Sequence, residues 1–288
     1  MLDLTERPLI MGIVNIGDDS VADTSHLRTL DERLAFARRQ LEHGADMIDI
    51  GVQSGRTDTA IISEADELER LLPLLHALAE DEVRVSVETW RPAVASAAIA
   101  AGAAIINDVS GLADPALATI AAETGAGLVV MHTRAQPKQA RFPDYEDPVV
   151  DVVEMLRERC AAAIALGVDP DQLIVDPGLD FAKTPAESVE VLRRLDDLRS
   201  LERPILLAVS RKYFLGMLTA RPPAERLAGT LAAIDHGVGH GASILRVHDV
   251  GAVAEFLHVR AALRDTGPPE LRGDPDSCEL KWLEPKSA

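Results

Sequence analysis

Three neighbouring segments set the architecture: LIMGIVN at Leu9–Asn15, LDERLAFARRQLEHGAD at Leu30–Asp46 and MIDIG at Met47–Gly51. The first and third are almost continuously apolar, which is typical of parallel strands covered on both faces. The middle segment places Leu34, Ala37 and Leu41 close to helical spacing, and Gly44 follows as a stop signal. Together they predict a strand, a helix and a second strand parallel to the first.

The same alternation runs through the rest of the chain. Further strands are expected at Arg84–Glu88, Ala104–Asp108, Gly127–His132, Leu173–Asp176, Ile205–Ser210 and Ser243–Val247. Helices are expected at Ser63–Glu80, which opens with an acidic variant of the capping box, and at Pro148–Val168. Eight strands alternating with helices predict an α/β fold, a (β/α)8 TIM barrel with eight parallel strands. A doubly wound open sheet remains the rival, because strand periodicity does not report closure.

Length and composition fit this architecture. The chain has 288 residues, which suits a single barrel domain over residues 1–265. Residues 266–288 are rich in Pro, Gly and charge and are expected to form an irregular tail.

The charge and the cysteines exclude several classes of protein. Acidic residues number 47 and basic residues 29, a net charge of −18, which argues against nucleic-acid binding but leaves room for an anionic small ligand at a local basic cluster. No apolar run is long enough to span a membrane, and no secretory signal is evident at the N-terminus. Cys160 and Cys278 form no metal or redox spacing. These features predict a cytoplasmic protein.

A polar side chain stands at the end of every predicted strand. In chain order these are Asn15, Asp49, Glu88, Asn107, His132, Asp176, the Ser210-Arg211-Lys212 run, and Arg246 with His248. The carboxyl ends of parallel strands meet at one face of a barrel, which is where barrel enzymes place their active sites. We therefore expect a ligand site at this face.

The polar residues divide into two chemical groups. Carboxylates and an amide suit hydrogen bonding around a flat, nitrogen-rich heterocycle, and are supplied by Asp49, Glu88, Asn107 and Asp176. Cations suit an anion such as phosphate, and are supplied by Arg211, Lys212, Arg246 and His248. Asn15 suits a metal ion or a phosphate. Structural interpretations stay open beside these: Lys212, Arg246 and His248 as ion-pair partners, and Asn15 as a loop cap.

Seven motifs in this order resemble the dihydropteroate synthase family. They are MGIVNI (Met11–Ile16), DIG (Asp49–Gly51), IINDVSG (Ile105–Gly111), MH (Met131-His132), VDPGLDFAKT (Val175–Thr184), SRK (Ser210–Lys212) and RVHDV (Arg246–Val250). Each is weak alone, but their order at successive strand ends makes the resemblance specific, and it runs from Pro8 to Leu263.

The resemblance implies an activity. Family enzymes join 4-aminobenzoate to a dihydropterin that carries a CH2-pyrophosphate, without a nucleophilic side chain. It implies pterin contacts from Glu88, Asn107, Asp176 and Lys212, and pyrophosphate contacts from Arg246, His248 and Arg56. It also implies that Ser210, Arg211 and Phe181 border the aminobenzoate, that Asn15 ligates Mg2+, and that the chain forms a homodimer.

Several positions depart from the family pattern. Asp18 replaces Pro, Val21 an aromatic residue, Gly55 a Thr, Thr57 a Pro, Glu88 an Asp, and Asp180 and Ala182 two glycines. New carboxylates at Asp18 and Asp180 are expected to repel an anion, and Glu88 to displace a pterin hydrogen bond. Together the changes are expected to lower kcat/KM by about 10²–10⁴.

Three functions follow as hypotheses. We favour a dihydropteroate synthase-like protein that keeps a pocket for a pterin-like, aminobenzoate-like or sulfonamide-like ligand but has weak or no synthase activity. The alternatives are an active dihydropteroate synthase and a pterin-dependent methyltransferase barrel that serves a corrinoid protein. The methyltransferase group lacks the SRK and RVHDV motifs that are present here.

Overall fold

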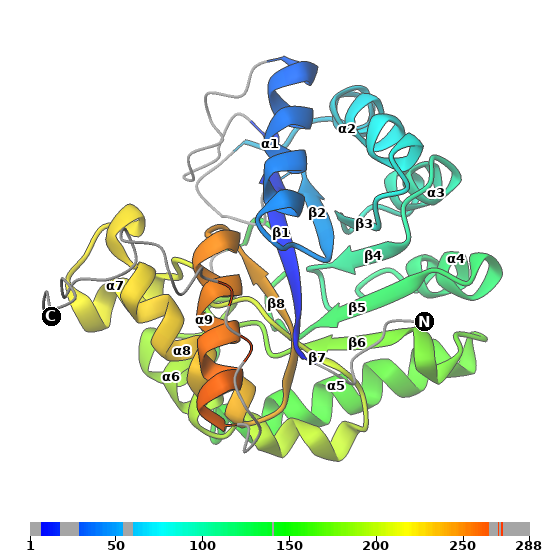
Figure 1. The fold of residues 1–288 in the computed structure, drawn as a ribbon. Coiled ribbons are helices and arrows are strands. Elements are labelled where there is room, and N and C mark those ends of the chain that lie inside the picture. The colour runs from blue at the N-terminus through cyan, green and yellow to red at the C-terminus, as the bar shows by residue number, and fades with distance from the viewer. Residues whose placement is uncertain are drawn as a thin grey trace, which may run out of the picture.

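The computed structural model describes residues 7–17, 29–53, 60–139, 141–264, 270 and 272. Its strands form a closed parallel barrel in sequence order, and its helices surround that barrel (Figure 1). The strands are β1 Leu9–Asn15, β2 Met47–Gly51, β3 Val85–Glu88, β4 Ile105–Asp108, β5 Gly127–Met131, β6 Leu173–Asp176, β7 Ile205–Leu207 and β8 Ala242–Val247.

Helices connect successive strands and close the chain. They are α1 Leu30–Glu42, α2 Glu64–Glu80, α3 Pro92–Ala100, α4 Ala116–Thr124, α5 Pro148–Ala165, α6 Pro185–Arg193, α7 Tyr213–Thr219, α8 Leu227–Gly239 and α9 Val250–Arg264. Three short 3₁₀ turns add η1 Pro170–Gln172, η2 Leu195–Leu201 and η3 Pro223–Glu225. The expected capping box at the start of α2 is present, because Ser63 accepts from the Asp66 amide and Asp66 accepts from the Ser63 amide.

Barrel closure confirms the predicted fold class. β1 pairs with β2 on one side and with β8 on the other, with Met11 opposite Arg246, so the sheet has no free edge and the open-sheet rival is wrong.

Some predicted strands and helices extend further than the observed ones. The seventh strand was expected to reach Ser210 but ends at Leu207, and the chain then turns through Arg211 at φ +59°. The helices expected to reach Asp46 and Val168 end before Gly44 and Gly167, whose φ values of +103° and +99° suit glycine.

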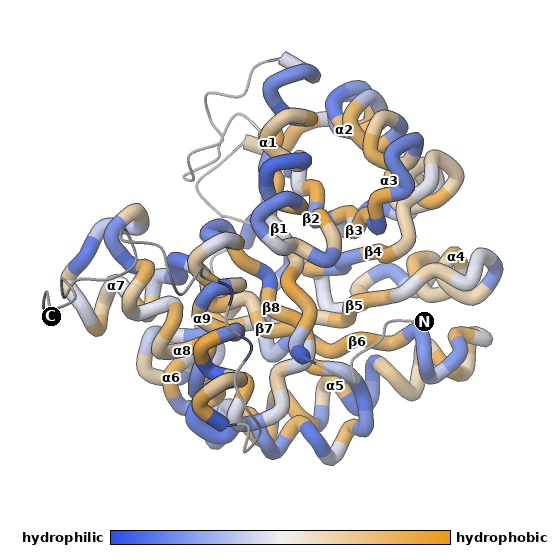
Figure 2. The backbone as a smooth tube through the Cα atoms, in the orientation of Figure 1, coloured by the Kyte–Doolittle hydropathy of each residue, from blue (hydrophilic) through white to orange (hydrophobic). Residues whose placement is uncertain are grey.

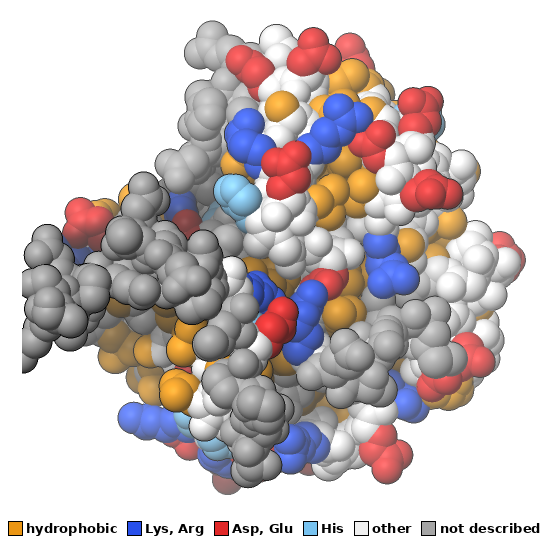
Figure 3. Space-filling view, in the orientation of Figure 1, with side chains coloured by type: hydrophobic (Ala, Val, Ile, Leu, Met, Phe, Trp, Pro, Cys, Tyr) orange, Lys and Arg blue, Asp and Glu red, His pale blue; other side chains and the backbone are white. Residues whose placement is uncertain are grey.

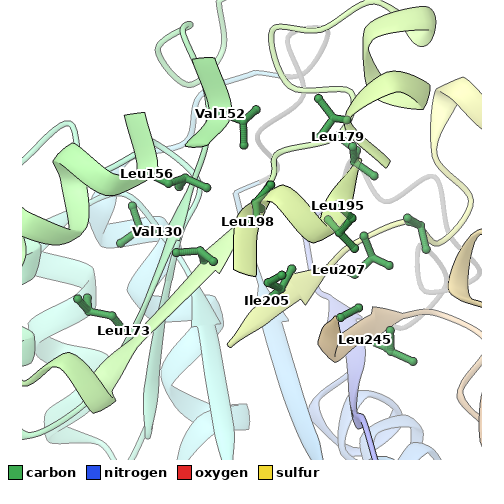
Figure 4. Close-up of a cluster of buried hydrophobic side chains, with 14 of the residues drawn as sticks. Val130, Val152, Leu156, Leu173, Leu179, Leu195, Leu198, Ile205, Leu207 and Leu245 are labelled. Atoms are coloured by element: carbon green, nitrogen blue, oxygen red, sulfur yellow. The ribbon is translucent and has the colours of Figure 1, made fainter. Parts of the chain in front are cut away.

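Apolar side chains fill both sides of the barrel wall. Between the strands and the helices lie clusters such as the one joining β5–β8 to α5 and η2 (Figure 4). The strands are the most hydrophobic part of the chain, while the surrounding helices alternate between polar and apolar (Figure 2). A further cluster contains Leu9, Met11, Met47, Ile105, Val129, Ile174, Leu206 and Ile244.

That last cluster positions the polar residues of the strand ends. Successive side chains on a strand point to opposite faces, so residues two apart share a face. Asp49 lies two residues beyond Met47, Asn107 two beyond Ile105, and Arg246 two beyond Ile244. The sequence therefore stacks a polar layer on an apolar plug, toward the carboxyl ends of the strands.

The outer surface is mixed in character. Acidic and basic side chains are interspersed over α1–α3 (Figure 3). Within the described ranges, no helix has both the length and the apolar character needed to cross a membrane.

Candidate active site

Four side chains from four strands form one connected group at the barrel mouth. Arg246 of β8 donates from Nε to Asp49 Oδ2 (2.7 Å) and from Nη2 to Glu88 Oε2 (2.6 Å). Asn107 of β4 donates its amide to both oxygens of Asp49 at 3.2 Å. The predicted convergence of β2, β3, β4 and β8 side chains is therefore seen directly in the structure.

Burial makes these charges interact strongly. Asp49 is fully buried, and the Glu88 and Arg246 side chains are 11% and 15% exposed. Burial opposes the charge on Arg246, but Asp49 and Glu88 outweigh it and raise the pKa of the guanidinium. Burial raises the pKa of Glu88, and Arg246 works against that rise. The guanidinium is the positive centre that holds both carboxylates in place.

Asp176 and Lys212 stand beside this group. Asp176 of β6 accepts from the Gly178 amide at Oδ1 (2.7 Å), and burial raises its pKa. Lys212 donates from Nζ to the Leu179 carbonyl (2.8 Å) and lies 4.5 Å from the centre of the Phe181 ring. Asp176, Arg246 and Glu88 all act electrostatically on Lys212, so these predicted site residues also lie at the mouth.

Two of the four cations expected from the sequence, Arg211 and His248, contact other protein side chains in the structure. Arg211 forms a two-point ion pair with Asp249, with N–O distances of 3.0 and 2.6 Å. His248 is near Ser210, whose Oγ lies 3.0 Å from Nδ1 and accepts from the His248 amide. Burial, with Arg246 and Arg211, lowers the pKa of His248 to about 3. His248 is thus neutral at pH 7, and the expectation of a cation there is corrected.

Asn15 ends β1 opposite Gly51 of β2. A Cβ at Gly51 would stand 2.7 Å from Asn15 Oδ1, so the absence of a side chain at Gly51 makes room for this amide. Mg2+ takes oxygen ligands and commonly keeps waters and substrate phosphates in its shell. One amide oxygen fits such an ion only as a partial ligand. The described residues contain no group of three or more His, Cys, Asp or Glu that would hold a metal unaided.

Arg56, Gly55 and Thr57 lie outside the residues that the structure describes, as do Asp18 and Val21.

Asp180 accepts from the amides of Tyr213 (2.5 Å) and Phe214 (3.2 Å) at the start of α7. Its charge also acts on Lys212 at the barrel mouth, and the expected repulsion of a bound anion stays a prediction. Asp180 and Ala182 have φ values of +64° and +50°. This left-handed backbone explains why glycine is the family residue at both positions.

Lys183 was missed by the sequence interpretation. It lies in the VDPGLDFAKT motif yet is only 2% exposed, whereas a loop lysine is usually taken to be solvated. Its Nζ lies 2.7 Å from Nδ1 of His132, a residue that the sequence interpretation left without a role. The signal available in the sequence was that this lysine belongs to a motif on which the family resemblance rests.

A cavity of about 860 Å³ lies elsewhere, beside the start of α5. Its lining includes Ser110, Thr133, Arg134, Tyr145 and Asp151, and none of the predicted site residues. It is separate from the polar group at the barrel mouth.

Known proteins match nearly the whole chain. A family model described as "Pterin binding enzyme" matches residues 11–248. The dihydropteroate synthase of Bacillus subtilis is 37% identical over 268 residues, covering 92% of each protein. The Xanthomonas albilineans dihydropteroate synthase structure with 4-aminobenzoic acid has a TM-score of 0.85 and 38% identity, covering 92% of this chain and 96% of that one.

Two further solved structures extend the comparison. The Xanthomonas albilineans enzyme in complex with 7,8-dihydropteroate has a TM-score of 0.82 and 37% identity, covering 92% of this chain and 97% of that one. The Yersinia pestis dihydropteroate synthase with a sulfonamide drug complex has a TM-score of 0.86 and 37% identity, covering 91% and 96%. The barrel, its polar mouth and these similarities agree, and the chain belongs to the dihydropteroate synthase family of pterin-binding enzymes.

Proposed function

We propose that this chain binds a reduced pterin bearing a CH2-pyrophosphate and condenses it slowly with 4-aminobenzoate. The amine nitrogen bonds to the methylene carbon, the bond from that carbon to the pyrophosphate oxygen breaks, and the amine loses a proton to solvent. No covalent bond to the protein forms. The task of the side chains is to orient the two substrates and stabilise the departing anion.

The pterin ring is proposed to bind between Asn107, Asp176 and Lys212. Asp176 uses Oδ1 for the Gly178 amide, and within the described part of the chain Oδ2 is left for a ring N–H group. Lys212 has further N–H groups beyond the one that it gives to Leu179. Phe181 lies against the ammonium of Lys212 and is proposed to border the aminobenzoate together with Ser210 and Arg211.

The anion is proposed to meet Arg246 and His248, with Arg56 from the second loop. The observation that supports slow turnover is the pair of hydrogen bonds that Arg246 donates, one to Asp49 and one to Glu88. An incoming pyrophosphate would share this guanidinium with two buried carboxylates, which take its Nε–H group and one N–H of Nη2. Four carboxylates act on the two cations Arg246 and Lys212, namely Asp49, Glu88, Asp176 and Asp180. That balance disfavours an anion.

Mg2+ fits this scheme as an ion shared with the pyrophosphate. Asn15 would supply one amide oxygen, and the phosphate oxygens and water the others. The ion would offset negative charge on the leaving group.

A fully active synthase is the second candidate. The similarity to dihydropteroate synthases over nine-tenths of the chain favours it. In that case the pyrophosphate displaces Glu88 from Arg246 at little cost, and the substituted positions are tolerated.

Steady-state kinetics with both substrates and Mg2+ separate the candidates. We expect product to form at a rate well below ~1 s⁻¹, the value at the lower end of ordinary enzyme turnover. Turnover near ~1 s⁻¹ or above would establish the fully active synthase. Calorimetry with the pterin pyrophosphate tests the site itself: binding weaker than millimolar would contradict any pterin function, and low-micromolar binding would favour the fully active enzyme.

A further inference from the structure

A buried lysine holds the loop that follows β6. We call residues 178–184 loop 6. Lys183 Nζ is 2.9 Å from the Gly178 carbonyl, 3.2 Å from the Phe181 carbonyl and 2.7 Å from His132 Nδ1. Burial lowers the pKa of Lys183 to about 7, and in its protonated form the three N–H groups match the three acceptors around Nζ. The side chain therefore ties loop 6 to the end of β5.

His132 supplies the acceptor through a defined tautomer. Its Nε2 lies 2.7 Å from Asp151 Oδ1, and the ring is completely buried. Because the carboxylate can only accept, we assign the ring proton to Nε2, which leaves the lone pair of Nδ1 for Lys183. Arg134 donates to both oxygens of Asp151 at 2.9 Å and forms the outer end of this chain of contacts.

Loop 6 lies between two lysines. On one side Lys183 holds the carbonyls of Gly178 and Phe181, and on the other Lys212 donates to the carbonyl of Leu179 at 2.8 Å. The Phe181 ring also faces Lys212 Nζ. The position of the Lys212 ammonium thus depends on the shape of a segment that Lys183 fixes.

The backbone of loop 6 needs such external contacts. Asp180 and Ala182 have positive φ values, a left-handed conformation that is unfavourable for residues other than glycine. Gly178 lies so close to the His132 carbonyl that a Cβ would collide with it. Strained segments persist only where their surroundings over-determine them.

We propose that Lys183 is a positioning residue for pterin binding, which it supports by fixing loop 6 and thereby Lys212, with His132 Nδ1 as its required acceptor. This inference rests on the proposed function for the identity of the ligand. Its structural half, the fixing of loop 6, stands independently of any ligand.

Two matched substitutions of His132 isolate the contact. In His132→Asn the amide oxygen takes the place of Nδ1 and still accepts from Lys183, but the contact with Asp151 is lost. In His132→Gln the amide reaches toward Asp151, and the acceptor for Lys183 is lost. Both variants remove the same ring, so a purely structural role would affect them alike. Lys183→Met removes the ammonium, and Arg134→Met is a control at the exposed end.

The test uses the full chain with 6-hydroxymethyl-7,8-dihydropterin pyrophosphate and Mg2+. Calorimetry should show affinity at least about tenfold weaker in Lys183→Met and His132→Gln, but within about threefold of the starting protein in His132→Asn and Arg134→Met. Amide hydrogen exchange of residues 178–184, measured without ligand, should speed up in the first two variants only.

Each outcome decides something. Equal losses in the two His132 variants, or unchanged exchange in loop 6 of a folded Lys183→Met, would overturn the inference. If Lys183→Met does not fold, the His132 pair decides alone. If the starting protein binds no pterin pyrophosphate, the proposed function fails, and the exchange pattern still decides whether Lys183 fixes loop 6.

Discussion

Arg246 and Glu88 form an ion pair across the mouth of the barrel, with 2.6 Å between Nη2 and Oε2. They belong to β8 and β3, which β1 and β2 separate in the closed sheet. The family residue at position 88 is an aspartate, shorter by one carbon–carbon bond of about 1.5 Å. We infer that the added length lets Glu88 reach the guanidinium that the proposed function needs for an anion.

Shortening this side chain should restore anion binding. In Glu88→Asp the carboxylate withdraws from Arg246, and we expect the pterin pyrophosphate to bind about tenfold more tightly or better, since a charged hydrogen bond is worth about 1.5–3 kcal/mol. Isothermal titration calorimetry with Mg2+ measures this. Glu88→Gln keeps the length but removes the negative charge, so it should also bind the pyrophosphate more tightly, and the two variants together separate the effect of length from that of charge. Weaker binding in Glu88→Asp would refute the idea that side-chain length limits the site.

The two left-handed residues of loop 6 other than glycine should respond differently to substitution. Ala182→Gly relieves backbone strain of about 1–2 kcal/mol and adds about 0.5–1 kcal/mol of unfolded-state entropy, so stability should stay equal or rise slightly. Asp180→Ala removes the acceptor for the Tyr213 and Phe214 amides and should cost about 1–2 kcal/mol. Urea unfolding measures both. A stabilised Asp180→Ala would show that the capping contact is unimportant.

A buried ion pair joins the first turns of α2 to the start of α3. Arg91 donates to Glu67 Oε2 at 2.6 Å, and the two side chains are 12% and 2% exposed. Thr89 donates to the same carboxylate, whose pKa is raised by burial and held back by Arg91. Arg91→Met leaves the Glu67 carboxylate buried without its ion-pair partner and should destabilise the protein by about 3–5 kcal/mol.

A second substitution checks the cause of that loss. Combining Arg91→Met with Glu67→Gln removes the negative charge at position 67, so the double variant should regain part of the lost stability in thermal and urea unfolding. Losses that simply add in the double variant would mean that the two side chains do not interact energetically.

The barrel and its polar mouth were predictable because both follow from short periods in the sequence. Continuous apolar runs identified the strands, and the two-residue period that buries Met47 and Ile105 also turns Asp49 and Asn107 into the barrel. The position of Arg246 beside them needed only the rule that parallel strand ends meet.

Contacts between distant loops were not predictable in this way. Asp180 caps a helix that begins at Tyr213, and Lys183 finds its acceptor at His132, 51 residues earlier. Neither partnership has a local pattern, and a charged loop residue is ordinarily solvated. The charge state of His248 was likewise hidden, because it depends on burial and on neighbouring arginines.

The depressed pKa of His248 predicts a loss of stability in acid. The value of about 3 lies below the unfolded value near 6.5, so between these pH values the unfolded chain binds the extra proton and the folded one does not. Stability therefore falls as pH falls through 6.5, and His248 should contribute a loss of about 2 kcal/mol between pH 7.5 and pH 5. Urea unfolding at the two pH values measures it against His248→Asn, which cannot titrate. The difference between the proteins cancels the buried carboxylates that titrate in both, and equal pH dependence in both would mean that the folded His248 titrates normally.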